Sequence, residues 1–224
     1  MESAIDLPRV LDFLEPCFFF AKRGLSQVTL VSPSVRDVLG YEPKQVIGGS
    51  YLDFVIHDDP INADLMECQT MDLSNGGRIQ ALRAVRAWDG SRRVLSIQTV
   101  GASDTEEKPV LTRHNVALDV TQSVDRYQKM SKRLTELTQC LGKMNASEHA
   151  IAYRLLDGKL NREIAKELNL SDRTVERRRA SILKRLGTNS HAKVVQLMVE
   201  RDLLTQMLEH NEPWHLARNA NLVC

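Results

Sequence analysis

Cysteine is scarce in this 224-residue sequence, and the four that occur are scattered. Cys17, Cys68, Cys140 and Cys224 form no C-x-x-C pair, which argues against a disulfide framework and against a zinc knuckle. No apolar run approaches the roughly 18–20 residues that cross a bilayer. The start, MESAIDLPRVLDFLEP, lacks the basic and apolar regions of a secretion signal. We therefore expect a soluble protein of the cytoplasm, a reducing compartment.

Motifs of the common catalytic sites are also missing. The sequence contains no H-E-x-x-H, G-x-S-x-G or G-x-G-x-x-G motif and no phosphate-binding loop of the Walker type. The densest polar cluster, His57-Asp58-Asp59-Pro60, resembles a metal or phosphorylation site at first sight. We interpret it instead as a turn that caps a helix beginning at Ile61. We expect neither an enzyme nor a metal site.

The chain as a whole lacks a strong charge of either sign, because its net charge is +1. Its parts differ, however. Residues 1–118 carry 12 Lys/Arg against 16 Asp/Glu, and residues 145–210 carry 12 against 9. Within Arg173–Arg185 six residues are basic and only Glu176 is acidic. Such locally concentrated positive charge is what a polyanion-binding surface needs.

The first region, about residues 10–118, is predicted to mix strands and short helices. Helices are expected at Ser32–Leu39, at Pro43–Val46 and, after Pro60, at Ile61–Met71, and the Asp89-Gly90 pair is typical of a hairpin turn. These elements predict an α+β fold whose helices cover one face of a five-stranded antiparallel sheet. The predicted strands are Phe18–Ala21, Val28–Val31, Ile79–Ala87, Arg92–Gly101 and Val110–Asp119.

The second region, about residues 119–144, has the period of one long helix. Two series of residues, each spaced by seven and offset by three, form the a/d pattern of a heptad repeat. Val120 extends the first series backwards, whereas Ser123 weakens the second. We expect a parallel coiled coil that pairs two chains; the alternative is a helix packed on its own domain. The two series are Tyr127, Leu134 and Leu141, and Met130, Leu137 and Met144.

The third region, about residues 145–210, is predicted to be entirely helical. Asn145 and Glu148 form a capping-box start, Gly158 ends that helix, and a fourth helix runs from Ser190 to about Leu208. Between them lie helices over residues 161–168 and 172–186, joined by the short link NLS. Two short helices with so tight a turn meet at a large angle, which is helix-turn-helix geometry. The tail, residues 211–224, shows no clear period.

In a helix-turn-helix pair the second helix lies in the DNA major groove, with its N-terminal turns against base edges. Val175, Ile182 and Leu186 mark the inner stripe of this helix, so the residues on the opposite side point outward. Arginine can contact guanine, and glutamate can accept a hydrogen bond from cytosine. We predict DNA contacts by Arg173, Thr174, Glu176, Arg177, Arg178, Ala180, Ser181 and Lys184.

One alternative stays open for this helix: arginine-rich helices are common, and a charged face is often only solvated. Arg179 lies nearer the inner stripe than its neighbours, so we interpret it as a structural residue whose stem packs inward and whose head lies at a phosphate.

The run NREIAKELNLSDRTVERRRASILKRLGTNSHAKVVQL resembles the four-helix LuxR/FixJ-type DNA-binding domain of bacterial transcription regulators. The shared features are E-I-A, L-x-L-S-x-R-T-V-E and I-L-K-R-L-G, within residues 145–208. The family usually begins with L-T-x-R-E, whereas this chain has M-N-A-S-E and keeps Glu148. In that family the fourth helix often forms the dimer contact, which here implies Val194, Val195, Leu197 and Met198.

The run SPSVRDVLGYEPKQVIGGSYLDFVIHDDP is similar to the opening of a PAS domain, and A-L-D-V-T-Q (Ala117–Gln122) resembles the motif that closes one. The resemblance covers about residues 8–122. It implies the fold but no particular ligand, because PAS cavities hold haem, flavin, small metabolites or nothing. The flavin motif N-C-R-F-L-Q is missing and no histidine lies within residues 61–71, so we expect no tightly bound cofactor.

These observations predict a homodimeric bacterial transcription regulator that binds double-stranded DNA. Its PAS domain (residues 1–118) would sense a signal or pair two chains, and a signalling helix (119–144) would control the helix-turn-helix domain (145–210). One alternative is a PAS-based adaptor whose helix-turn-helix contacts RNA polymerase or another regulator, and a second is a redox or gas sensor that holds haem.

Overall fold

The computed structural model describes residues 16–73, 76–103 and 111–210. The described chain divides into two compact units, with the boundary between Asp125 and Arg126. The strand predicted at Val110–Asp119 begins one residue outside these ranges, and the tail at 211–224 lies wholly outside them. In the described part of the chain, no helix is both long enough and apolar enough to cross a membrane.

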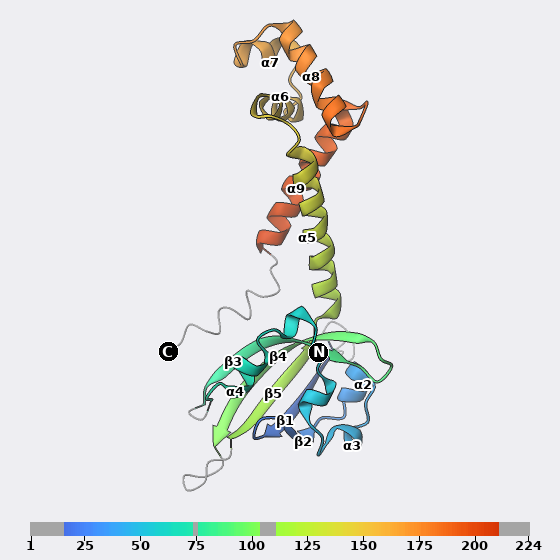
Figure 1. Cartoon of the computed structure of the whole chain (residues 1–224), viewed down its shortest axis with the longest axis vertical. Helices are drawn as coiled ribbons and strands as arrows, with labels where there is room; N and C mark the ends of the chain where they lie inside the picture. Colours follow the sequence, from blue (N-terminus) through green and yellow to red (C-terminus); the bar gives the residue numbers. More distant parts are fainter. Residues whose placement is uncertain (1–15, 74–75, 104–110, 211–224) are drawn as a thin grey trace, which may run out of the picture. The chain divides into compact units, whose positions relative to one another are not determined.

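The first unit is built on a five-stranded antiparallel sheet with the order β2-β1-β5-β4-β3 (Figure 1). This confirms the predicted fold class, and each predicted strand is found with its ends shifted by at most two residues. Gly90 has a φ of 81° in the turn between the third and fourth strands, which is why glycine follows Asp89 there. The strands are β1 Cys17–Arg23, β2 Gln27–Val31, β3 Arg78–Arg86, β4 Arg92–Ser103 and β5 Leu111–Asp119.

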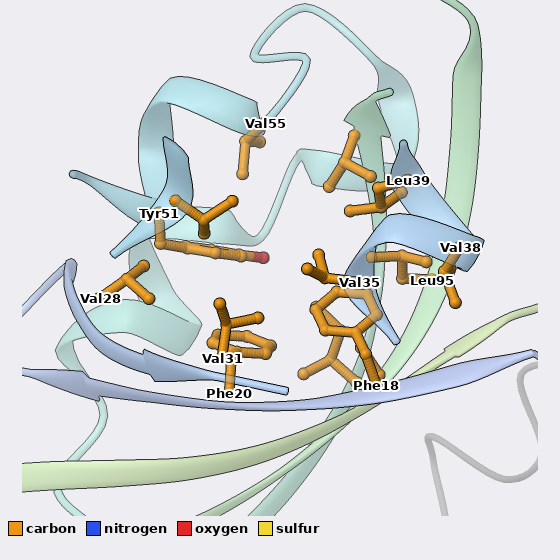
Figure 2. Close-up of a cluster of buried hydrophobic side chains, with 14 of the residues drawn as sticks. Phe18, Phe20, Val28, Val31, Val35, Val38, Leu39, Tyr51, Val55 and Leu95 are labelled. Carbon is orange, nitrogen blue, oxygen red and sulfur yellow. The ribbon is translucent and has the colours of Figure 1, made fainter. Parts of the chain in front are cut away.

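Short helices cover one face of this sheet and enclose the core (Figure 1). Alternation along β1 directs Phe18 and Phe20 into the core, whereas Phe19 is 36% exposed on the opposite face. Figure 2 shows the rings of Phe18 and Phe20 among side chains that include Val35 and Tyr51. The helices are α2 Val35–Leu39, α3 Pro43–Val46, η1 Tyr51–Phe54, η2 Pro60–Asn62 and α4 Leu65–Thr70.

The continuous helix predicted at residues 61–71 is wrong, because the segment forms η2 and then the separate α4. Asn62 is the reason: its side-chain amide donates to the carbonyl oxygens of Ile56 and Ala84 and accepts from the Ala84 amide. Two of these bonds join the side chain to Ala84 of the neighbouring strand and one joins it to Ile56, so the chain is fixed at that point. The interpretation of the turn before it is supported, since the Asp59 carboxylate accepts from the Ile61 amide at 3.0 Å.

Five helices follow the sheet, and the last four surround a second core. α5 begins in the first unit and continues in the second. Its last turn contributes Leu141, and the following Met144 joins the same cluster, together with Ile151, Ile164 and Ile182. The helices are α5 Thr121–Leu141, α6 Ala146–Leu156, α7 Asn161–Glu167, α8 Asp172–Leu186 and α9 His191–His210.

Candidate nucleic-acid interface

The candidate interface is built on α7, a tight turn and α8, and the residues of the turn explain its geometry. Asn169 has a left-handed φ of 52°, a conformation that asparagine tolerates better than most residues. The Leu170 amide then donates to the Ala165 carbonyl oxygen, which closes the end of α7. The Ser171 hydroxyl accepts from the Thr174 amide and caps α8. Gly187, with a φ of 64°, follows the last residue of α8, which spans the residues 172–186 that were predicted for it.

One face of α8 is fixed by apolar burial. Val175 and Ile182 are fully buried, and Leu183 and Leu186 pack partly against the same cluster. Each fully buried aliphatic side chain stabilises the domain by about 1.5–3 kcal/mol relative to an exposed one. The angular position of α8 on this core therefore determines which of its side chains point outward.

The opposite face of α8 carries an exposed basic stripe, which consists of Arg173, Arg177 and Lys184 with Glu176 and Ala180 beside them. All five side chains are exposed, and Arg178 is half-buried at the edge. None of the three basic side chains of the stripe forms an ion pair or hydrogen bond with another described residue. Unpaired exposed cations around a small alanine leave this surface open to a polyanion.

Ser181 and Thr174 lie differently from the stripe. The Ser181 hydroxyl donates to Glu148 Oε1 at 2.6 Å, and Arg185 Nε reaches the same oxygen at 3.1 Å. The Thr174 hydroxyl is 2.9 Å from that of Ser171, within the cap of α8. These contacts turn Ser181 toward α6 and keep Thr174 at the start of the helix.

Glu148 joins α6 to α8 and is only 2% exposed. Its other oxygen accepts from the Asn145 amide, and the Asn145 side chain accepts from the Glu148 amide, as in the predicted capping box. Burial by itself would raise the pKa of Glu148, but the bonds from Ser181 and Asn145 and the charge of Arg185 outweigh it and lower the pKa. A carboxylate with a lowered pKa stabilises the fold above its unfolded pKa, and that contribution is lost in acid.

Arg179 forms a contact among three helices. Its guanidinium donates to the Asn161 side chain at the start of α7 and to His191 Nε2 at the start of α9. Burial and the Arg179 charge lower the pKa of His191, which favours the neutral ring that accepts this bond. The geometry therefore fits the structural part of the prediction for Arg179, whose head bonds to two neighbouring helices.

The residues predicted for dimerisation fall into two groups. Four are buried inside a single chain: Leu137, Leu141, Val194 and Met198 are at most 1% exposed. The other five, which lie on α5 and α9, are half-buried. Those five are Tyr127, Met130, Leu134, Val195 and Leu197.

An apolar stripe on α9 was missed by the sequence analysis. Val199, Leu203 and Met207 are 39%, 53% and 47% exposed. Their spacing of four residues places them on one side of the helix. The signal was available, since residues 194–208 are apolar on two sides and a single core covers only one.

Comparison with known proteins gives the family of each part. Residues 141–198 match the family described as bacterial regulatory proteins, luxR family, and residues 9–112 match the PAS fold. Among curated proteins, none matches this sequence.

Solved structures resemble the chain only distantly. A Vibrio cholerae VqmA dimer without target DNA is 19% identical, with a TM-score of 0.36 over 88% of each chain. A Vibrio cholerae VqmA–ligand–DNA complex is 19% identical, with a TM-score of 0.33 over 88% of this chain and 89% of that one. The PAS-B domain of Drosophila melanogaster Cycle is 17% identical, with a TM-score of 0.40 over 46% of this chain and 96% of that one.

Proposed function

Because the chain joins a PAS domain to a luxR-family DNA-binding domain, it is a DNA-binding transcription regulator, and we propose that it acts as a homodimer whose PAS domain controls DNA binding through α5. The exposed basic stripe of α8 is the observation that carries this proposal. It offers three unpaired cations on the helix that a helix-turn-helix domain inserts into the major groove.

Roles within the stripe follow from position. Arg177, at its centre, would contact guanine, and Glu176 would accept from cytosine. Ala180 would allow close approach, while Arg173, at the start of α8, would contact phosphates together with Thr174. Arg178 and Lys184 would add backbone contacts. Ser181 is not part of this set, because its hydroxyl already donates a hydrogen bond to Glu148.

Two exposed apolar surfaces support dimerisation. On α9, Val199, Leu203 and Met207 form the stripe described above. On the PAS sheet, Phe19 and Val116 are cross-strand partners on the face opposite the core, and they are 36% and 48% exposed. A dimer would cover both surfaces and present two copies of α8 to half-sites about one helical turn apart.

α5 is suited to transmit a change because each of its ends is held in a core. In the first unit, the Thr121 hydroxyl accepts from the Val94 amide at 2.8 Å, and Val124 is fully buried. In the second, Leu141 is buried and Arg133 forms a bidentate ion pair with Glu200 of α9, at 2.7 and 2.9 Å. A change in the PAS domain would therefore reach the DNA-binding domain through a helix that is fixed at both ends.

Insertions in α5 test this coupling. Two alanines added between Gln128 and Lys129, both exposed, rotate everything beyond by about 200°, whereas seven added residues rotate it by only about 20°. We expect the two-residue insertion to weaken binding to a two-half-site duplex by about tenfold or more, because the heads lose their matched spacing. The seven-residue insertion serves as the control and should retain affinity within about threefold. Equal affinity and equal regulation in both variants would contradict the proposal.

A further inference from the structure

Three cations project from the inner face of the PAS sheet into one cavity. Lys22 on β1, Arg83 on β3 and Arg113 on β5 are each only 3% exposed. All three line a cavity together with Phe20, Tyr51 and Asn115. Lys22 and Arg113 are moreover direct cross-strand partners, an arrangement of like charges that destabilises a sheet. Buried charge is retained in proteins when something compensates it.

The protein compensates this charge incompletely. Arg83 donates to the Leu82 carbonyl oxygen and pairs with Asp64 at 2.8 Å, but the Asp64 side chain is half exposed. Arg113 donates to the carbonyl oxygens of Cys68, Gln69 and Met71 at the end of α4, and the charge of the exposed Asp72 also acts on it. Lys22 contacts the Gln69 amide oxygen, donates to the Leu25 carbonyl oxygen at 3.4 Å and lies 4.8 Å from the centre of the Tyr51 ring. No acidic side chain is among the described residues that line the cavity.

Two buried donors also lack partners. Arg83 Nη2 and Arg113 Nε have no hydrogen bond to any described residue. An unpaired buried donor on a charged group is costly, and folded proteins rarely keep one without a reason. Both atoms belong to guanidinium groups, whose planar donors match the two oxygens of a carboxylate.

A second, apolar cavity adjoins the cationic one, because Phe20 and Tyr51 line both. Figure 2 shows these two rings within the apolar cluster, beside Val28 and Val31. Each cavity holds about 30 Å³ of free space, enough for only a few non-hydrogen atoms. A fitting ligand therefore has one anionic end and a short apolar end.

We propose that this PAS core binds a small organic acid, with its carboxylate at Lys22, Arg83 and Arg113 and its carbon chain against Phe20 and Tyr51. Burial, together with the charges of Arg113 and Arg83, lowers the pKa of Lys22 to about 7, so a bound carboxylate would draw a proton back onto this amine. Control of DNA binding by this acid rests on the proposed function, whereas binding of the acid does not.

Titration of the full chain by calorimetry, without DNA, tests the proposal. The probes are acetate, propionate, butyrate, pyruvate and lactate, each with its neutral amide, and inorganic phosphate. We expect at least one acid to bind at least about 100-fold more tightly than its amide, because the amide leaves the cations unpaired. Lys22→Met and Arg83→Met should abolish binding, whereas Lys44→Met, an exposed site on α3, should not.

A second measurement does not depend on how the variants fold. The Lys22 amine of the unaltered chain, followed by NMR, should show a pKa that rises from about 7 when the acid is added. Four results would overturn the proposal: no acid binds, an amide or phosphate binds as tightly as the acid, folded Lys22→Met and Arg83→Met retain affinity, or the Lys22 pKa stays fixed. DNA affinity is measured separately, so loss of acid binding can be distinguished from loss of DNA binding.

Discussion

Arg177→Glu combined with Lys184→Glu is expected to lower affinity for operator DNA by about 100-fold or more. Both side chains lie on the exposed stripe of α8 and have no partner among the described residues, so their replacement breaks no internal contact. The lost base contact of Arg177 costs about 1–3 kcal/mol, the lost backbone contact of Lys184 adds to it, and reversed charge adds repulsion from the phosphates. Binding is measured by fluorescence anisotropy at fixed salt.

A control with the same change in net charge separates the stripe from general electrostatics. Lys44→Glu combined with Lys129→Glu alters two exposed sites on α3 and α5 and should leave affinity within about threefold. The single Arg177→Ala refines the result. If Arg177 contacts a base, the variant should lose about 1–3 kcal/mol of binding free energy at one base position. If it contacts a phosphate, the variant should lose the same binding free energy on every DNA sequence. Equal weakening by both double variants would contradict the assignment of the stripe.

Lys22→Met is expected to stabilise the PAS domain at neutral pH and to remove a rise of stability in alkali. The folded pKa of Lys22 is about 7, below the ordinary 10.5, because of burial and of Arg113 and Arg83. Between these two values the unfolded chain holds a proton that the folded chain has released, so the free energy of unfolding rises with pH. Below pH 7 both states are protonated and the cost of burying the charge stays constant. The full effect is up to about 5 kcal/mol.

The quantity to measure is the difference in unfolding free energy between Lys22→Met and the unaltered chain, by urea denaturation from pH 6 to pH 10. Other groups near Lys22, namely Arg83, Arg113, Tyr51, Cys68 and Asp64, are present in both proteins and largely cancel. The advantage of the variant should be greatest at pH 6 and should shrink toward pH 10. Lys44→Met should give a difference independent of pH. A flat difference for Lys22→Met would show that the amine is not desolvated.

Much of the fold was predictable because local patterns and packing agree. Alternation around Phe18 and Phe20, glycine at 90 and 187, and the Asn145–Glu148 box each specify a local geometry that the core then uses. The helix over residues 61–71 was wrong because its interruption depends on Asn62 bonding to a strand more than twenty residues away. Sequence patterns do not record such distant contacts.

The sequence predicts which face of α8 is exposed, but not which contacts each side chain of α8 makes. The period of α8 placed Arg177 and Lys184 outward, whereas the role of Ser181 depends on Glu148, 33 residues earlier. The heptad spacing of Leu137 and Leu141 did not tell whether a partner chain or the chain's own core buries them; within one chain both are buried. Lys22 lies just beyond the predicted strand Phe18–Ala21, yet it has the same parity as Phe18 and Phe20, which places it on the inner face of β1.

The central claim is that α8 reads DNA sequence as one of two heads in a dimer. Its most direct test is selection from a random duplex pool at several salt concentrations, with sequencing of the retained fraction. We predict enrichment of a two-fold symmetric site whose half-sites lie about one helical turn apart. Retention without enrichment, fading steeply as salt rises, would contradict the claim, because it would reduce the stripe to a polyanion-binding surface.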